Sequence, residues 1–157
     1  MSETHAITVE KVLPYPPERI WRTLTRSELI AKWLMPNDFE PVVGYRFTFQ
    51  TKPMGDWDGI VQCEVLQCDP PELLRYSWKG GSDSNPAYGS RLNSEVTWTL
   101  TKVAGGTHLK MVHEGFVFPG NQFAFEAMAS GWGNVPNVIE RVTAETEASP
   151  AAGTPAA

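Results

Sequence analysis

Hydrophobic and polar residues alternate with a period of two in six segments of this chain. In the first segment, Ile7, Val9, Lys11 and Leu13 share one face. Because successive side chains of a strand point to opposite faces, this pattern predicts antiparallel strands that pack on one side of a sheet. The apolar positions of the other five segments are Tyr45, Phe47 and Phe49; Val61, Cys63 and Val65; Leu74, Tyr76 and Trp78; Val96, Trp98 and Leu100; and Leu109 and Met111.

The last apolar segment, from Asn121 to Glu145, has a helical period instead. Spacings of three and four positions predict one long amphipathic helix, with Asn121 as its N-terminal cap. Pro136 cannot donate a hydrogen bond to the carbonyl of Trp132, so a bend is predicted there. The apolar stripe consists of Phe125, Met128, Trp132, Val135, Ile139 and Val142.

Two short helices are predicted between the first strand and the other strands. Pro16 and Pro17 suit the first turn of one helix, and Ser27 is expected to cap the other. The order of elements predicts an α+β fold, in which an antiparallel sheet of about six strands wraps around a long C-terminal helix. A twisted sheet leaves a cavity wherever side chains do not fill the space beneath the helix.

Composition narrows the class of protein. The 157 residues predict one domain, residues 1–145, followed by a flexible Ala/Pro-rich tail, residues 146–157. A net charge of −5 with scattered Lys and Arg argues against nucleic acid as a partner. The sequence has neither a long apolar stretch nor a signal peptide, so we expect no membrane insertion and a cytoplasmic location.

Cys63 and Cys68 fall on opposite strand faces, which disfavours a disulfide or a shared metal.

Several stretches together resemble a known family. Residues 12–21, VLPYPPERIW, resemble the start of START-like helix-grip proteins, the SRPBCC superfamily. Within it, the chain resembles the branch named after the activator of the heat shock protein 90 ATPase, over residues 5–145. The stretches that carry this resemblance are KWL at 32–34, GYRF at 44–47, CDPPELL at 68–74 with Trp78, VTWTL at 96–100, GTHL at 106–109, VHEGF at 112–116 and Gly131-Trp132.

This resemblance implies a single-domain, bacterial-type protein whose curved sheet grips the C-terminal helix around an apolar cavity. It does not imply one activity. Relatives in the superfamily bind lipids, sterols or polyketides, and some are cyclases or aromatases. The eukaryotic co-chaperone has a separate N-terminal domain that this sequence lacks, so co-chaperone activity is not expected. No cofactor is implied, and the chain is expected to be a monomer or a homodimer.

Aromatic side chains dominate the face of the sheet that is predicted to be the inner one. A filled core and a ligand pocket both require such residues, and the sequence leaves these two interpretations open. If a pocket is present, its lining is expected to comprise Trp33, Phe47, Phe49, Tyr76, Trp78, Trp98, Met111, His113, Met128 and Trp132.

His113 is the polar residue of greatest interest on this face. Alternation places it beside Met111 and sends Glu114 to the opposite face. Three interpretations are open: a polar anchor for a ligand, a histidine satisfied by a backbone or helix group, and a general base. His108 lies on the other face, so no metal site is predicted. Asp58 is expected to be a solvated turn carboxylate, with an acid at the cavity mouth as the alternative.

The leading hypothesis is a module that binds a small hydrophobic or aromatic molecule between the sheet and the last helix. The 79–91 loop and the turn from Met54 to Asp58 would edge its entrance. One alternative is a cyclase- or hydrolase-type enzyme acting on a similar apolar substrate, which requires at least two polar groups aimed at one point. Another is a chaperone-ATPase-interacting domain, which requires an exposed apolar patch.

Overall fold

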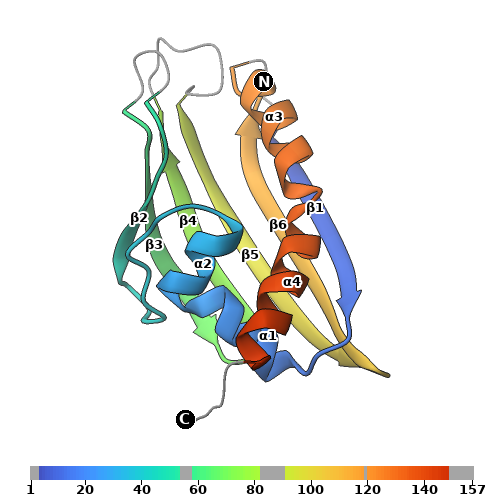
Figure 1. Ribbon diagram of the computed structural model, residues 1–157. Coiled ribbons are helices and arrows are strands. Elements are labelled where there is room, and N and C mark those ends of the chain that lie inside the picture. The colour runs from blue at the N-terminus through green and yellow to red at the C-terminus, as the bar shows by residue number, and fades with distance from the viewer. Residues whose placement is uncertain (1–3, 54–57, 82–90, 119, 149–157) are drawn as a thin grey trace.

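A computed structural model describes residues 4–53, 58–81, 91–118 and 120–148. Six antiparallel strands form one curved sheet, and the helices all lie against one of its faces (Figure 1). This arrangement confirms the predicted fold class and the alternating segments. The strands, in their order across the sheet, are β1 (Thr4–Leu13), β6 (Gly106–Val117), β5 (Leu92–Val103), β4 (Leu73–Gly80), β3 (Ile60–Asp69) and β2 (Arg46–Gln50).

Two short helices follow β1, as predicted: α1 (Pro17–Thr25) and α2 (Ser27–Trp33). Pro17 occupies the first turn of α1. The prediction that Ser27 caps α2 is wrong, because Ser27 is already helical and its Oγ donates to the carbonyl of Asn37 at 2.8 Å. Asn37 in turn forms a bridge with Phe49 of β2. The serine therefore fastens α2 to the segment that runs along the edge of the sheet.

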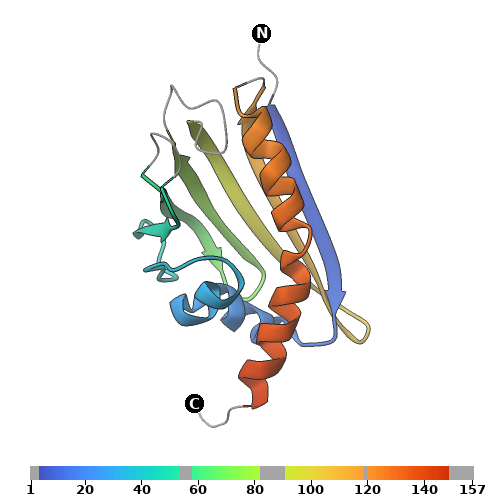
Figure 2. The same cartoon turned by 45° about the horizontal axis from the view of Figure 1, so that its top comes forward.

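The C-terminal helical segment is confirmed, but it is divided in two. Helix α3 (Gln122–Trp132) and helix α4 (Val135–Ala148) run end to end across the inner face of the sheet (Figure 2). Gly133 and Asn134 form a break between them, directly after Trp132. Since Pro136 offers no backbone N–H to the Trp132 carbonyl, the helix is interrupted where the bend is predicted. Helix α4 extends three residues into the predicted tail, and residues 149–157 lie outside the described part of the chain.

Asn121 does not cap α3 as predicted. It occupies the N-cap position, but its side chain makes no capping bond to the helix. Instead, its Oδ1 accepts from the Val117 N–H at 2.9 Å and its Nδ2 donates to the Arg91 carbonyl at 2.7 Å. The backbone N–H of Asn121 donates to the Val117 carbonyl at 2.7 Å, and this turn directs the Asn121 side chain back toward the strands. Asn121 therefore ties the start of α3 to β6 and to the residue before β5.

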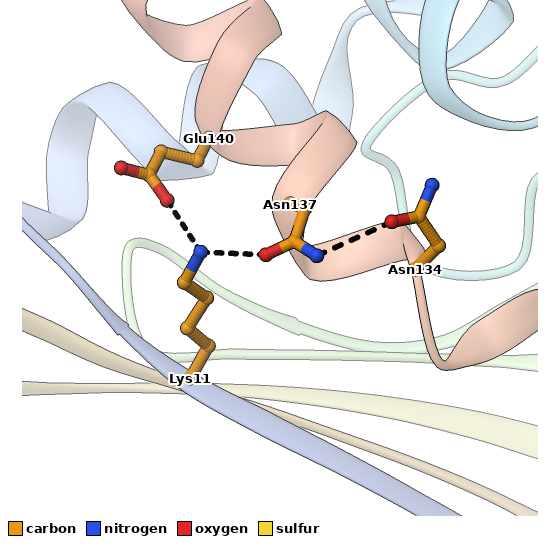
Figure 3. A network of polar contacts seen from close by, with 4 residues as sticks. All are labelled: Lys11, Asn134, Asn137 and Glu140. Atoms are coloured by element: carbon orange, nitrogen blue, oxygen red, sulfur yellow. Dashed lines mark hydrogen bonds and ion pairs between the residues drawn. The ribbon is translucent and has the colours of Figure 1, made fainter.

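Helix α4 is fastened to the rest of the domain by polar contacts. Lys11 of β1 reaches across to Asn137 Oδ1 at 2.6 Å and to Glu140 Oε1 at 2.8 Å (Figure 3). Asn137 also donates to Asn134 Oδ1 in the helix break at 3.2 Å. On the α1 side, Thr143 is held by two further contacts: Arg19 Nη2 donates to its carbonyl at 2.9 Å, and Thr23 Oγ1 lies 2.8 Å from its hydroxyl.

None of the helices within the described ranges is both long and apolar enough to cross a membrane.

Candidate functional site

The predicted lining residues meet in one buried cluster on the inner face of the sheet, which runs from β2 to α3. All ten of them are buried, with exposed fractions of 0–8%. They come from α2, β2, β4, β5, β6 and α3, and their rings touch edge to face or at a tilt. The centroid separations include 5.4 Å for Trp33 and Trp98, 5.9 Å for Trp98 and Trp132, 5.9 Å for Trp78 and Trp132, 5.2 Å for Phe49 and Trp78, and 5.4 Å for Phe47 and Tyr76.

Two rings of this cluster are missing from the predicted set. Phe39, whose centroid is 4.9 Å from that of Phe47, lies in an aperiodic segment that gives no pattern to follow. The ring centroid of Phe116 lies 4.6 Å from that of His113, although strict alternation along β6 would place Phe116 on the outer face. Gly115 has a φ of 112°, and the β1–β6 register shifts beside it, which marks a bulge. A glycine within a strand is the signal that could have revealed the shift.

His113 is the centre of a chain of hydrogen bonds that joins four elements. Trp132 Nε1 donates to His113 Nδ1 at 3.1 Å, and His113 Nε2 lies 2.8 Å from Ser94 Oγ. An indole N–H can only donate, so Nδ1 is the acceptor and Nε2 carries the proton of the neutral ring. Ser94 then accepts from Nε2 and donates to the Trp78 carbonyl at 2.8 Å. We call this chain the His113 relay; it connects α3, β6, β5 and β4.

The relay favours one of the three interpretations of His113. Its two ring nitrogens are both satisfied, one of them by a helix side chain, and its neighbour Glu114 is exposed on the other face as predicted. Burial lowers the pKa of His113 from its usual 6.5 to about 3. A general base needs a free acceptor nitrogen, and Nδ1 is already bonded to Trp132. The enzyme hypothesis therefore loses its leading candidate residue.

A second buried pair lies farther along the cluster. Trp98 Nε1 donates to the Tyr76 hydroxyl at 3.0 Å, and burial raises the pKa of that hydroxyl above its usual range. Trp33 Nε1 donates to the Thr23 carbonyl at 2.9 Å, which joins α2 to α1. Met111 and Met128 complete the buried lining from β6 and α3.

The predicted entrance lies mostly outside the described residues, because 54–57 and 82–90 are not described. Asp58 is exposed, and its Oδ1 accepts from the Ile60 N–H at 3.0 Å, as expected of a turn carboxylate. Cys63 and Cys68 are both free. In the ranges that the structure describes, no group of three His, Cys, Asp or Glu side chains could hold a metal ion.

Two surface grooves can be described, and neither includes a residue of the predicted lining. One groove, of about 480 Å³, lies on the outer face of the sheet and is bordered by Glu64, Glu95 and Glu114. The other groove, of about 610 Å³, lies where α1 begins beside the β3–β4 turn.

Comparisons with known proteins show which family and which solved structures this chain is similar to. The sequence model of a family described as "Activator of Hsp90 ATPase homolog 1-like protein" matches residues 14–144. The structure is similar to that of protein MLL2253 from Mesorhizobium loti, with 38% identity over 91% of this chain and 99% of that one, and a TM-score of 0.78.

More distant structures show the same fold. BH1534 from Bacillus halodurans is 22% identical over 91% of this chain and 99% of its own, with a TM-score of 0.71. Mll3558 from Rhizobium loti is 15% identical over 90% of this chain and 99% of its own, with a TM-score of 0.74. No curated protein matches the sequence.

Proposed function

The chain belongs to the activator of Hsp90 ATPase homolog 1-like family, and on that premise we propose that it binds a small hydrophobic or aromatic ligand between the sheet and α3. The SRPBCC-type fold of this family commonly binds hydrophobic ligands. The observation that carries the proposal is the concentration of aromatic rings from five elements, α2, β2, β4, β5 and α3, in one buried cluster on the inner face of the sheet. Burial of an apolar ligand among them would contribute about 25 cal/mol per Å² of apolar surface removed from water.

The unequal attachment of the two C-terminal helices supports this proposal. Helix α4 is fastened to β1 and α1 through Lys11, Arg19 and Thr23. Among the described residues, the side chains of α3 itself make one hydrogen bond to the sheet, from Trp132 to His113. We infer that α3 moves about the Gly133–Asn134 break to admit the ligand while α4 stays in place.

Titration with the neutral apolar probe N-phenyl-1-naphthylamine, followed by NMR of the tryptophan indole N–H groups, tests this site. The signals of Trp78, Trp98 and Trp132 should shift together and saturate near one equivalent of probe. Trp21 of α1, which lies outside the ring cluster, is the internal control and should not shift. Native mass spectrometry of freshly purified protein should also reveal a co-purifying small molecule.

Two results would contradict binding at this site. The first is the absence of any saturable shift together with the absence of a co-purifying molecule. The second is a shift confined to Trp21, which would place the probe outside the interior.

A further inference from the structure

The inner face of β4 carries two hydrogen-bond donors that bond to no acceptor among the described residues. They belong to Tyr76 and Trp78, whose exposed fractions are 2% and 3%. The two residues are separated by one position, so their side chains lie on the same face of the strand, roughly 7 Å apart along it. Their rings border those of Phe49, at 6.1 Å and 5.2 Å between centroids.

The hydroxyl of Tyr76 is used only as an acceptor. Trp98 Nε1 donates to its oxygen, so the Tyr76 O–H hydrogen is still available. Among the described residues no acceptor bonds to it. The rings that border it, those of Phe39, Phe47 and Phe49, carry no lone pair.

Trp78 differs from the other interior tryptophans. Trp33, Trp98 and Trp132 each donate their indole N–H to an acceptor of the protein. In the ranges that the structure describes, the N–H of Trp78 has no such partner, although its backbone carbonyl accepts from Ser94. The Tyr76 hydroxyl is buried, and a buried donor without an acceptor costs about 1–3 kcal/mol, so this position favours a ligand that supplies an acceptor atom. Trp78 Nε1 is not one of the fully buried atoms that lack a partner, so its N–H is a second donor that such a ligand can reach.

The charge of the interior decides what kind of acceptor fits. The buried polar residues are Thr, Ser, Asn and a histidine, and no Lys or Arg is buried among the residues described. The histidine is neutral, because burial lowers its pKa to about 3. A carboxylate or phosphate would therefore lie in this interior without a counter-charge, at a high desolvation cost. A neutral carbonyl oxygen accepts a hydrogen bond without that cost.

We infer that the ligand is an apolar, ring-containing molecule with at least one neutral carbonyl-type oxygen, which accepts the Tyr76 O–H while the Trp78 N–H provides a second donor. This inference rests on the proposed function and specifies its ligand class.

A matched pair of probes tests the inference: 9-fluorenone and fluorene, which share a three-ring skeleton and differ by a carbonyl in place of a CH₂ group. Calorimetry on the wild-type protein should show about 3- to 10-fold tighter binding of fluorenone, the value of one hydrogen bond. The Tyr76→Phe variant should reduce the ratio of the two affinities to near one. Tyr15→Phe, which removes the hydroxyl of a half-buried tyrosine outside the ring cluster, should preserve the ratio.

A spectroscopic measurement covers the case in which Tyr76→Phe fails to fold, since that variant leaves the Trp98 N–H without its acceptor. In the wild-type protein, the carbonyl stretch of bound fluorenone should move to lower wavenumber than in a hydrocarbon solvent. Equal affinities for both probes with an unshifted carbonyl stretch would overturn the inference and leave apolar binding intact. If neither probe bound, the proposed function and this inference would both be overturned.

Discussion

His113 is surrounded by neutral groups, and this explains its protonation state. Ser94, Trp132, Trp78 and Phe116 pack around the imidazole, and none of them carries a charge that could stabilise an imidazolium. Protonation at Nδ1 would also set two N–H groups against each other across the 3.1 Å bond to Trp132. The relay therefore requires the neutral ring, and its integrity depends on pH.

We predict that the protein loses stability in acid because of this residue. The unfolded chain binds a proton at His113 below about pH 6.5, whereas the folded protein does so only near pH 3. The free energy of unfolding should therefore fall as the pH drops from about 6.5 to about 3, by roughly 2 kcal/mol between pH 7.5 and pH 5. Urea denaturation at several pH values measures this slope.

The controls for the pH slope are two histidine variants. His113→Gln should be less stable at neutral pH and should lose most of the slope between pH 7.5 and pH 5. His108→Gln removes a histidine that pairs with Glu10 outside the interior, and it should preserve the slope. A wild-type slope that persists in His113→Gln would assign the effect to other groups.

The sequence predicted the face on which His113 lies but not its partners. Alternation along β6 depends only on neighbouring residues, so Met111 and His113 were placed correctly. Ser94 and Trp132 reach His113 from β5 and α3, and no local pattern shows which side chains of distant elements meet. Phe116 was missed because the bulge at Gly115 breaks the period on which the prediction relied.

At the scale of elements, the break separates α3, whose own side chains make one described hydrogen bond to the sheet, from α4, which has several polar contacts with β1 and α1. The apolar stripe from Phe125 to Val142 predicted the whole helical segment, because both helices place apolar side chains against the core at helical spacing. Gly131, Gly133 and Pro136 indicated a bend. The polar side chains that distinguish the helices, Lys11 and Thr143 among them, bond to residues far away in sequence, so the unequal attachment could not be predicted.

We predict that Gly131→Ala stabilises the protein by roughly 0.5–1 kcal/mol. Gly131 is exposed in α3, and a Cβ added there meets nothing within 4 Å. Gly115→Ala is the opposite control, because its φ is +112° and an added Cβ would lie 2.8 Å from the Asn93 carbonyl oxygen. It should cost at least about 1 kcal/mol in the same denaturation experiment. A loss of stability in Gly131→Ala would show that α3 needs the freedom of glycine when folded.

At the scale of the whole molecule, α3 is expected to open while the sheet stays intact. Hydrogen exchange followed by mass spectrometry should show faster exchange in peptides covering 122–132 than in peptides covering 135–145. Saturation with fluorene should slow exchange in the first set and leave the second nearly unchanged, if the ligand binds between the sheet and α3 as proposed. Equal exchange in the two helices would argue against opening about the Gly133–Asn134 break.

The global architecture was predictable because strand period, helix period and their order along the chain together determine the fold class. The order of strands within the sheet was not. Nothing in the pattern of Ile7, Val9 and Leu13 indicates that their strand pairs with β6, which comes last in the sequence. The predicted entrance consists of loops without a hydrophobic period, so the positions of its residues could not be predicted either.

The pairing of β1 with β6 has a consequence for how the protein is made. Leu13 lies opposite Thr107, and within the described sheet β1 has no other strand beside it. During synthesis on the ribosome, the first strand to emerge must therefore wait for the last one with both of its edges unpaired. Such non-local pairing slows folding, and an unpaired edge invites association with other chains. The domain can close only after β6 has left the exit tunnel, so its folding cannot be completed before that strand has been synthesised.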